Sequence, residues 1–176
     1  TDSAFETGLK KAGLSLDLRK IDANVRDGIR AKAKMITGKN LSAYIEGRLG
    51  LIFDTTSAKS GKIANYKKML DALGYEYKMI YVSASLDNAQ KRNEKRARKL
   101  PPEIVKSDWE KAQKNSSAFK SMFKKDFIEV KNDDDIKSLD NKASKLYGKL
   151  MTWSSQFPGN KLATAWKEQE LISKKR

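Results

Sequence analysis

The sequence predicts an α/β protein built around a parallel sheet. Residues 49–53, Leu-Gly-Leu-Ile-Phe, form an apolar run that ends at Asp54, and residues 79–82, Met-Ile-Tyr-Val, form a second one. Between the two runs, apolar residues recur at helical spacing over residues 63–73. A strand, a helix and a second strand in this order favour parallel pairing, with helices covering the sheet.

Two helical segments are predicted before this unit. Phe5 and Leu9 share helical spacing in a short first helix that ends at Gly13. A second apolar stripe over residues 25–36 predicts a helix that ends at Gly38, and one brief helical turn follows before Gly47. These segments precede the first predicted strand directly.

After residue 82 the pattern predicts alternating helices and one more strand. A basic helix over residues 85–98 ends before Pro101 and Pro102, and a Trp-containing helix leads from there to a short strand at residues 127–130. Turn signals at residues 132–135 and 157–160 introduce two last helices, the second starting at Lys161. The apolar residues of the last helix are expected to be buried or to dock on a partner.

The composition limits the chemistry available to the chain. Its 176 residues and 19.9 kDa suit one domain with a core of its own. The absence of cysteine and histidine excludes disulfides, the common zinc sites, cysteine nucleophiles and Ser-His catalysis. Apolar runs are too short to span a bilayer and no signal peptide is recognisable, so we expect a cytoplasmic protein without a membrane partner.

The charge is strongly basic. Lysine and arginine number 37 against 22 acidic residues, a formal net charge of +15, and residues 141–176 hold eight basic and two acidic residues. This balance favours a phosphate-rich partner such as nucleic acid, bound through the C-terminal part. Lysines spread over helices as a solvated face are the alternative.

Arginines gather in the predicted helix over residues 85–98. Arg92 and Arg96 are four residues apart, hence on one helical face, and Arg98 near the helix end can reach the same place. Clustered guanidinium groups suit the oxygens of a phosphate that is being transferred. A solvated helix in which Glu94 pairs locally with these arginines is the alternative.

The order of these elements and their motifs resembles the P-loop kinases of the zeta-toxin-like and polynucleotide-kinase-like group, in particular a bacteriophage-encoded branch. The residues that carry the resemblance are Thr1-Asp2-Ser3, Lys10 to Leu14, Glu46 to Thr56, and Ser85 to Arg98. The resemblance covers residues 1–132. It implies a partial three-layer P-loop kinase core over residues 1–132, with a lid at about 85–102, and a helical basic extension over residues 133–176.

The resemblance also implies what the 176 residues lack. No G-x-x-x-x-G-K-[ST] phosphate loop occurs in the sequence, and residues 57–63 imitate one only in part, because Thr56 replaces its first glycine and Ile63 its metal-binding hydroxyl. The first two strands of the family fold, the first of them central to its sheet, are then missing too. Since the chain starts with Thr1, we expect an upstream segment that was cleaved, omitted or left unrecorded.

Catalytic roles follow from the resemblance for three residues. Asp2 stands where the family places an acid that orients the acceptor hydroxyl, and its alternative is a cap on the helix beginning at Ser3. Arg92 and Arg96 correspond to lid arginines that close over ATP and stabilise the charge of the moving phosphoryl group.

Binding roles follow for four more residues. Asp54 resembles the carboxylate after the third strand, and Arg48, Thr55 and Arg98 are candidate substrate or phosphate ligands. For Asp54 a turn with the following threonines is the alternative, and for Arg48 a helix C-terminus. Thr55 stands where the family tends to have glycine, which puts substrate binding at this turn in doubt.

The function implied is phosphoryl transfer from ATP with Mg²⁺ to a hydroxyl acceptor, inactive without the upstream phosphate loop. The partners implied are that upstream segment, a nucleotide, and nucleic acid or other phage proteins at the basic C-terminal part. The alternative is a non-enzymatic phage virion protein or nucleic-acid-binding protein that reuses the kinase scaffold, located in the infected host cell or the virion. No residue is proposed as a metal ligand.

Overall fold

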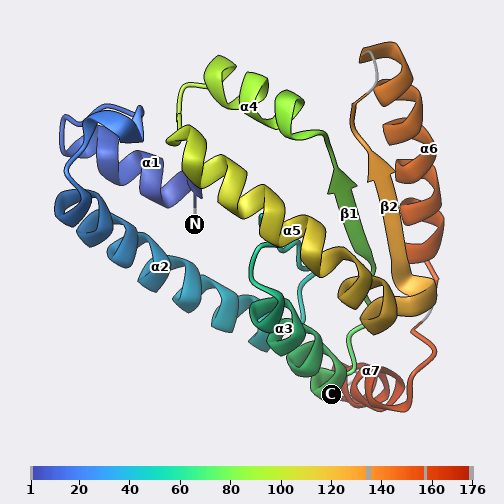
Figure 1. Ribbon diagram of the computed structural model, residues 1–176. Helices are drawn as coiled ribbons and strands as arrows, with labels where there is room; N and C mark the ends of the chain where they lie inside the picture. Colours follow the sequence, from blue (N-terminus) through green and yellow to red (C-terminus); the bar gives the residue numbers. More distant parts are fainter. Residues whose placement is uncertain (1, 134–135, 157, 175–176) are drawn as a thin grey trace. The chain divides into compact units, whose positions relative to one another are not determined.

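The structure is a computed structural model that describes residues 2–133, 136–156 and 158–174 (Figure 1). Its regular elements are α1 (Asp2–Lys11), α2 (Ala23–Glu46), α3 (Ser60–Leu73), β1 (Met79–Ser83), α4 (Leu86–Lys95), α5 (Pro102–Phe123), β2 (Phe127–Lys131), α6 (Ile136–Ser154) and α7 (Lys161–Ser173), with short 3-10 turns at Leu18–Lys20 and Lys124–Asp126. The described residues form two compact units. Unit 1 contains residues 1–56 and 86–109, and unit 2 contains residues 57–85 and 110–176.

The sheet consists of two parallel strands in the described part of the chain. β1 and β2 lie side by side and point the same way, with Met79 opposite Phe127 and Ser83 opposite Lys131 (Figure 1). This confirms a parallel sheet and the strands predicted at residues 79–82 and 127–130, although the pairing joins these two strands rather than residues 49–53 and 79–82. The protein is therefore a mostly helical α/β protein with a small parallel sheet.

The strand predicted over residues 49–53 is wrong in the described structure. Residues 49–56 form neither helix nor strand, and the Ile52 side chain is 98% exposed. An apolar run becomes a strand only where a neighbouring strand accepts and donates its backbone hydrogen bonds. No third strand among the described residues supplies that ladder.

Unit 1 has a small core where α1 packs on α2. Phe5 and Leu9 of α1 are fully buried, and Leu18 and Ala33 complete the cluster. The helices approach closely at Gly8, where an added Cβ would lie 2.6 Å from Ile29 Cγ2. Leu100 packs on the same cluster, so the chain after α4 is tied to this core.

Helix α2 is longer than predicted. Asp22 caps it by accepting hydrogen bonds from the backbone N–H groups of Asn24 and Val25, and it continues through Gly38 to its C-terminal cap at Gly47. A glycine inside a helix costs only about 1 kcal/mol relative to alanine. Gly38 therefore weakens this 24-residue helix without ending it.

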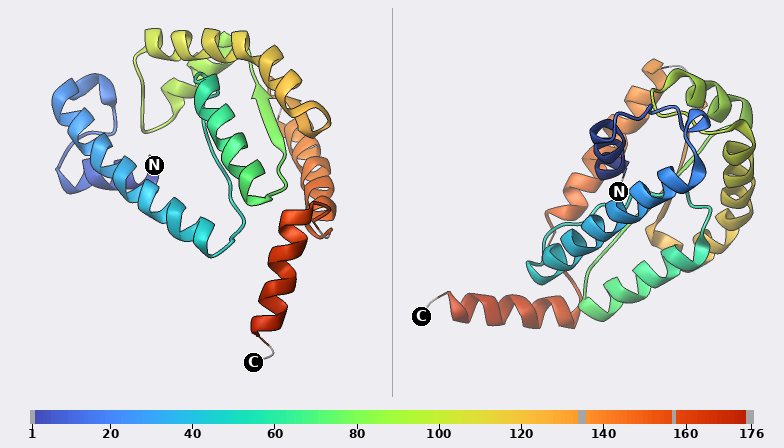
Figure 2. Two further views of the ribbon diagram at one scale, coloured as in Figure 1. Left: turned by 90° about the horizontal axis from the view of Figure 1, so that it is seen from below. Right: turned by 90° about the vertical axis from the view of Figure 1, so that its left-hand side faces the viewer.

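Unit 2 has an aromatic core between its sheet, α3 and α5. Tyr81 of β1 is 3% exposed, packs near Phe119 and stacks on Phe127, and its hydroxyl donates a 3.0 Å hydrogen bond to the Ala112 carbonyl. Ile63 of α3 joins this cluster, and Figure 2 shows α3 alongside β1. Burial of this kind, at about 25 cal/mol per Å², is what holds the sheet under its helices.

The C-terminal helix α7 is fixed at its first turn. The Asn160 side chain accepts a hydrogen bond from Ala163 N and donates one to the Gly74 carbonyl, and Glu76 accepts one from Gly159 N. The large apolar side chains of α7 are exposed rather than buried: Leu162, Trp166, Leu171 and Ile172.

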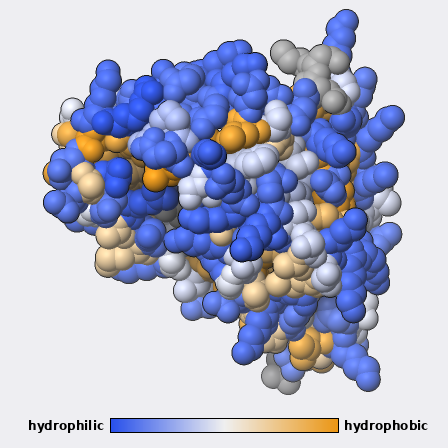
Figure 3. All heavy atoms as spheres, viewed as in Figure 1, coloured by the Kyte–Doolittle hydropathy of each residue, from blue (hydrophilic) through white to orange (hydrophobic). Residues whose placement is uncertain are grey.

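Two predicted turns fall partly outside the described residues, at residues 134–135 and 157. The helices predicted after them are confirmed as α6 and α7. Among the described residues no helix is both long enough and apolar enough to cross a membrane. Figure 3 shows a face of mainly hydrophilic side chains, with smaller hydrophobic groups between them.

Candidate functional site

Helix α4 ends three residues earlier than predicted. It stops at Lys95, and Arg96 and Arg98 lie in the irregular segment that follows. Arg92 and Arg96 therefore do not share one helical face, which corrects the prediction. The cause is the side chain of Asn93, which holds the following segment in another conformation.

Asn93 is 3% exposed and hydrogen-bonds through both ends of its amide. Nδ2 donates to the Leu100 carbonyl at 2.8 Å, and Oδ1 accepts from Leu100 N at 3.0 Å. Oδ1 also accepts from Nη2 of Arg96 at 3.1 Å. One buried side chain thus closes the loop after α4 and fixes one edge of the Arg96 guanidinium.

Arg98 is held by two carboxylates of α1. Its Nη2 lies 2.6 Å from Asp2 Oδ2, its Nε lies 3.0 Å from Glu6 Oε1, and its side chain is 15% exposed. Asp2 and Glu6 are one helical turn apart, so both face the same way. The structure thereby joins two of the predicted site residues, Asp2 and Arg98, which are 96 positions apart in the sequence.

Arg96 lies close enough to Arg98 for the two charges to interact. Partial burial, followed by the positive charge of Arg98, lowers the pKa of Arg96, while Asp2 and Glu6 act in the opposite direction. Two guanidinium groups held close together favour a neighbouring anion, and here the carboxylates of Asp2 and Glu6 already fill that role at Arg98. We call Asp2, Glu6, Asn93, Arg96 and Arg98 the arginine cluster.

Arg92 lies on α4, outside this arginine cluster, and its side chain is exposed. The acid predicted to pair locally with the arginines, Glu94, instead lies 3.1 Å from Arg19 Nη1 and 3.6 Å from Lys99 Nζ. Both contacts tie α4 to neighbouring parts of unit 1.

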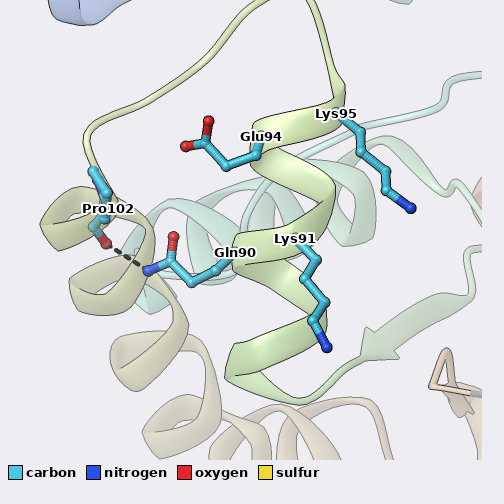
Figure 4. A pocket seen from close by; sticks show the side chains of 5 residues that line it. All are labelled: Gln90, Lys91, Glu94, Lys95 and Pro102. Carbon is cyan, nitrogen blue, oxygen red and sulfur yellow. Dashed lines mark hydrogen bonds between the residues drawn. The ribbon is translucent and has the colours of Figure 1, made fainter.

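An open hollow of about 660 Å³ lies beside α4. Figure 4 shows Gln90 and Glu94 projecting toward the segment at Pro102, and Lys91 and Lys95 projecting to the other side. Gln90 Nε2 donates a 2.8 Å hydrogen bond to the Pro102 carbonyl. None of the predicted site residues lines this hollow, so it is not the candidate site.

Three predicted binding residues lie outside the arginine cluster. Arg48 follows the end of α2 with a φ of 51°, and its backbone N–H donates to the Ile45 carbonyl, as expected of a helix C-terminus. Asp54 is exposed and Thr55 half-buried in the irregular segment 49–56. In the described part of the chain, neither residue makes a hydrogen bond or ion pair with the arginine cluster.

In the turn that imitates a phosphate loop, two backbone carbonyls accept hydrogen bonds from a side chain of α5. Asn115 Nδ2 donates to the carbonyls of Ser57 and Ala58 at 3.1 and 3.3 Å, which fixes this turn against α5. α3 then begins at Ser60 without a side-chain cap. Its sequence makes this turn unsuited as a phosphate cradle, because Thr56 and Ile63 replace the first glycine and the metal-binding hydroxyl.

Comparison with protein families identifies the chain. The model of the family described as zeta toxin matches residues 18–144, well over half of the sequence. The chain belongs to the zeta toxin family. Membership indicates a nucleotide-binding function of the P-loop kinase type and confirms the resemblance at the level of the family. No curated protein and no solved structure matches the chain.

In this zeta toxin family member the matched range includes six of the seven predicted site residues. Asp2 lies outside it, as does Glu6. Sequence reasoning missed Glu6 and the bridging role of Asn93. For Glu6 a signal existed, because it stands one helical turn after Asp2 on the same face of α1.

ATP and Mg²⁺ are the typical ligands of the family. The arginines of the cluster suit phosphate oxygens. For Mg²⁺ the fit is poor, because no three Asp or Glu side chains gather closely enough among the described residues to hold a metal ion. No metal ligand is therefore assigned among the described residues.

Proposed function

We propose that residues 1–176 are the C-terminal part of an ATP-dependent kinase that transfers a phosphoryl group to a hydroxyl acceptor. The observation that carries the proposal is the arginine cluster, where Arg96 and Arg98 lie beside Asp2 in a member of the zeta toxin family. The phosphate loop would come from outside residues 1–176, since the sequence contains no such loop.

The proposed roles follow the chemistry of each group. Arg96 and Arg98 bind the transferred phosphoryl group, and Arg92 joins them when nucleotide draws α4 toward the phosphates. Asp2 is 58% exposed and keeps one carboxylate oxygen outside its 2.6 Å contact with Arg98. That oxygen accepts a hydrogen bond from the acceptor hydroxyl and orients it for attack.

The edge of the sheet supports a contribution from an upstream segment. β1 pairs with β2 alone among the described strands, and its side chains Ile80 and Val82 are 38% and 56% exposed. Parallel sheets are normally covered on both faces, and an unpaired strand edge is open to pairing with a further strand. An apolar strand leading into a phosphate loop would pair with the open edge of β1 and extend the sheet.

The test compares transfer of the γ-phosphate by the protein with its natural upstream segment and by residues 1–176 alone. We expect turnover only in the longer protein. Replacing either Arg92 or Arg96 by alanine should lower its turnover by roughly 10³-fold, as loss of a phosphate-stabilising arginine does elsewhere. Labelled ATP and a panel of hydroxyl acceptors provide the measurement.

Arg26→Ala is the matched control for these variants. Arg26 belongs to the same unit, but its Nε pairs with the neighbouring Asp27 at 3.1 Å. Turnover should stay within twofold of the unchanged protein. Full activity in both Arg92→Ala and Arg96→Ala would refute the role given to these arginines.

A second candidate function rests on the exposed apolar side of α7. Leu162, Leu171 and Ile172 are each more than half exposed, and the surrounding residues 141–176 carry six more basic than acidic groups. We propose as the alternative a non-enzymatic protein of a phage particle or a nucleic-acid-binding protein, which docks through α7.

Deletion of residues 151–176 tests this alternative. Binding to duplex DNA should fall steeply as salt rises, and the deletion should abolish it. An unchanged affinity after deletion would remove α7 and the basic C-terminal part from the function.

A further inference from the structure

Glu6 occupies a part of the Arg98 guanidinium that a phosphate would otherwise bind. It accepts from Nε of Arg98, while Asp2 accepts from Nη2, so the two carboxylates occupy one whole side of the guanidinium. That side offers the parallel pair of N–H groups that a phosphate uses for bidentate binding. Arg98 makes no other hydrogen bond or ion pair within the described residues.

The formal charges of the cluster cancel. Arg96 and Arg98 contribute two positive charges, and Asp2 and Glu6 two negative ones. A phosphate group that approached Arg98 from its other side, where Glu6 and Asp2 do not bind, would still lie close to both carboxylates, which repel it. The Arg98 side chain is only 15% exposed and that of Glu6 35%, so water screens this repulsion incompletely.

Both sides of the ion pair are firmly anchored. Phe5 and Leu9, which flank Glu6 on α1, are fully buried, and Asn93 ties the segment carrying Arg98 through its two bonds to Leu100. The backbone positions are therefore set, and only the side chains need to move for Arg98 to change partners.

We propose that Glu6 is an internal competitor that keeps Arg98 occupied until a phosphate-bearing ligand displaces it. The proposal rests on the kinase function proposed above and adds its regulation: Glu6 sets the threshold ligand concentration at which the arginine site becomes available. Glu6 gives up its contact with Nε of Arg98 to the incoming phosphate. Asp2 stays beside the acceptor hydroxyl.

The experiment titrates inorganic tripolyphosphate into the full 176-residue chain by calorimetry at fixed ionic strength. Glu6→Gln keeps a hydrogen-bond acceptor but removes the charge. We expect it to bind tripolyphosphate roughly three- to fivefold more tightly than the unchanged protein, the upper range for loss of a partly screened charge. The Nε–H resonance of Arg98 should move on titration of the unchanged protein, as its contact with the Glu6 carboxylate gives way to phosphate.

Glu94→Gln is the control, because Glu94 also belongs to unit 1 and pairs with Arg19 and Lys99 rather than with Arg98. Its affinity should stay within twofold. The double variant Glu6→Gln with Arg98→Ala should lose the gain, and circular dichroism melts verify that each variant is folded.

The outcomes separate this proposal from the function on which it rests. If the unchanged protein binds tripolyphosphate, Arg96→Ala weakens that binding and Glu6→Gln does not tighten it, the competitor role is refuted and the arginine site stands. If no variant binds tripolyphosphate, both the competitor role and the phosphate site of this chain are refuted.

Discussion

The buried side chain of Asn93 fixes the conformation of the segment that follows α4. Its amide pairs with both backbone groups of Leu100 and also reaches Arg96. The same bonds place Leu100 over the core of unit 1. Stability and the position of an arginine in the candidate site thus depend on one residue.

Replacing Asn93 by alanine should therefore destabilise the protein. The change leaves two backbone groups of Leu100 without their partner. Each unsatisfied group lowers the free energy of unfolding by about 1–3 kcal/mol. Urea denaturation followed by circular dichroism measures it. Asn141→Ala on the exposed surface of α6 is the control, with an expected change within about 0.5 kcal/mol.

The lowered pKa of Asp17 leads us to expect that the folded protein loses stability in acid. The side-chain hydrogen bond from Arg19 lowers the pKa of Asp17 from its usual 3.8 to about 2. A carboxyl group with a lowered pKa contributes stability fully above about pH 4 and loses that contribution as the pH falls toward 2.

Carbon-detected NMR titration of the Asp17 carboxyl should show a midpoint near pH 2 and, in Arg19→Ala, a midpoint closer to 4. The same substitution should reduce the pH dependence of the melting temperature between pH 4 and pH 2. A midpoint near 4 in the unchanged protein would contradict the ion pair.

At the scale of elements, the contact between α1 and α2 depends on a missing side chain. A Cβ at Gly8 would lie 2.6 Å from Ile29 Cγ2, whereas nothing lies within 4 Å of a Cβ at Gly38. Gly8 and Gly38, both in unit 1, are therefore opposite cases in a matched pair of substitutions.

Gly8→Ala should destabilise the protein by about 1–3 kcal/mol, because the helices must separate to admit the methyl group. Gly38→Ala should stabilise it by about 0.5–1 kcal/mol, because alanine favours the helical conformation and meets no obstacle. Equal effects of the two changes in urea denaturation would mean that the close approach does not exist.

The sequence predicted those elements whose signals are local. Helical spacing and a following glycine identify α1 and α3, and short β-rich runs identify β1 and β2. The strand at residues 49–53 was wrong because its hydrogen-bond partners cannot be read from its own residues. The end of α4 was also misplaced, since Asn93 and Leu100 determine it through a contact that no periodicity reveals.

The candidate site was predictable only in part, for a similar reason. The pairing of Asp2 with Arg98 joins residues 96 positions apart, and it was the family resemblance that drew attention to both. Arg48, Asp54 and Thr55 were assigned on the strength of the same resemblance, and their roles stay predictions. Glu6 was overlooked because an acid in a helix ordinarily indicates a solvated surface.

At the scale of the whole molecule, the two units are interleaved along the chain. Unit 1 is built from residues 1–56 and 86–109, so its second part is inserted between the two parts of unit 2. The core of unit 1 includes Leu100, and the sheet of unit 2 joins residues 79–83 to residues 127–131. Neither unit corresponds to one continuous piece of sequence.

This interleaving has a consequence for folding during synthesis. On the ribosome, α1 and α2 emerge long before Leu100, and β1 must wait for about 48 further residues before β2 can pair with it. At translation rates of about 5–20 residues per second, the β1 edge is exposed for several seconds. Until residue 131 has left the exit tunnel, the nascent chain thus carries an apolar extended segment at residues 79–83 whose partner strand has not yet been made.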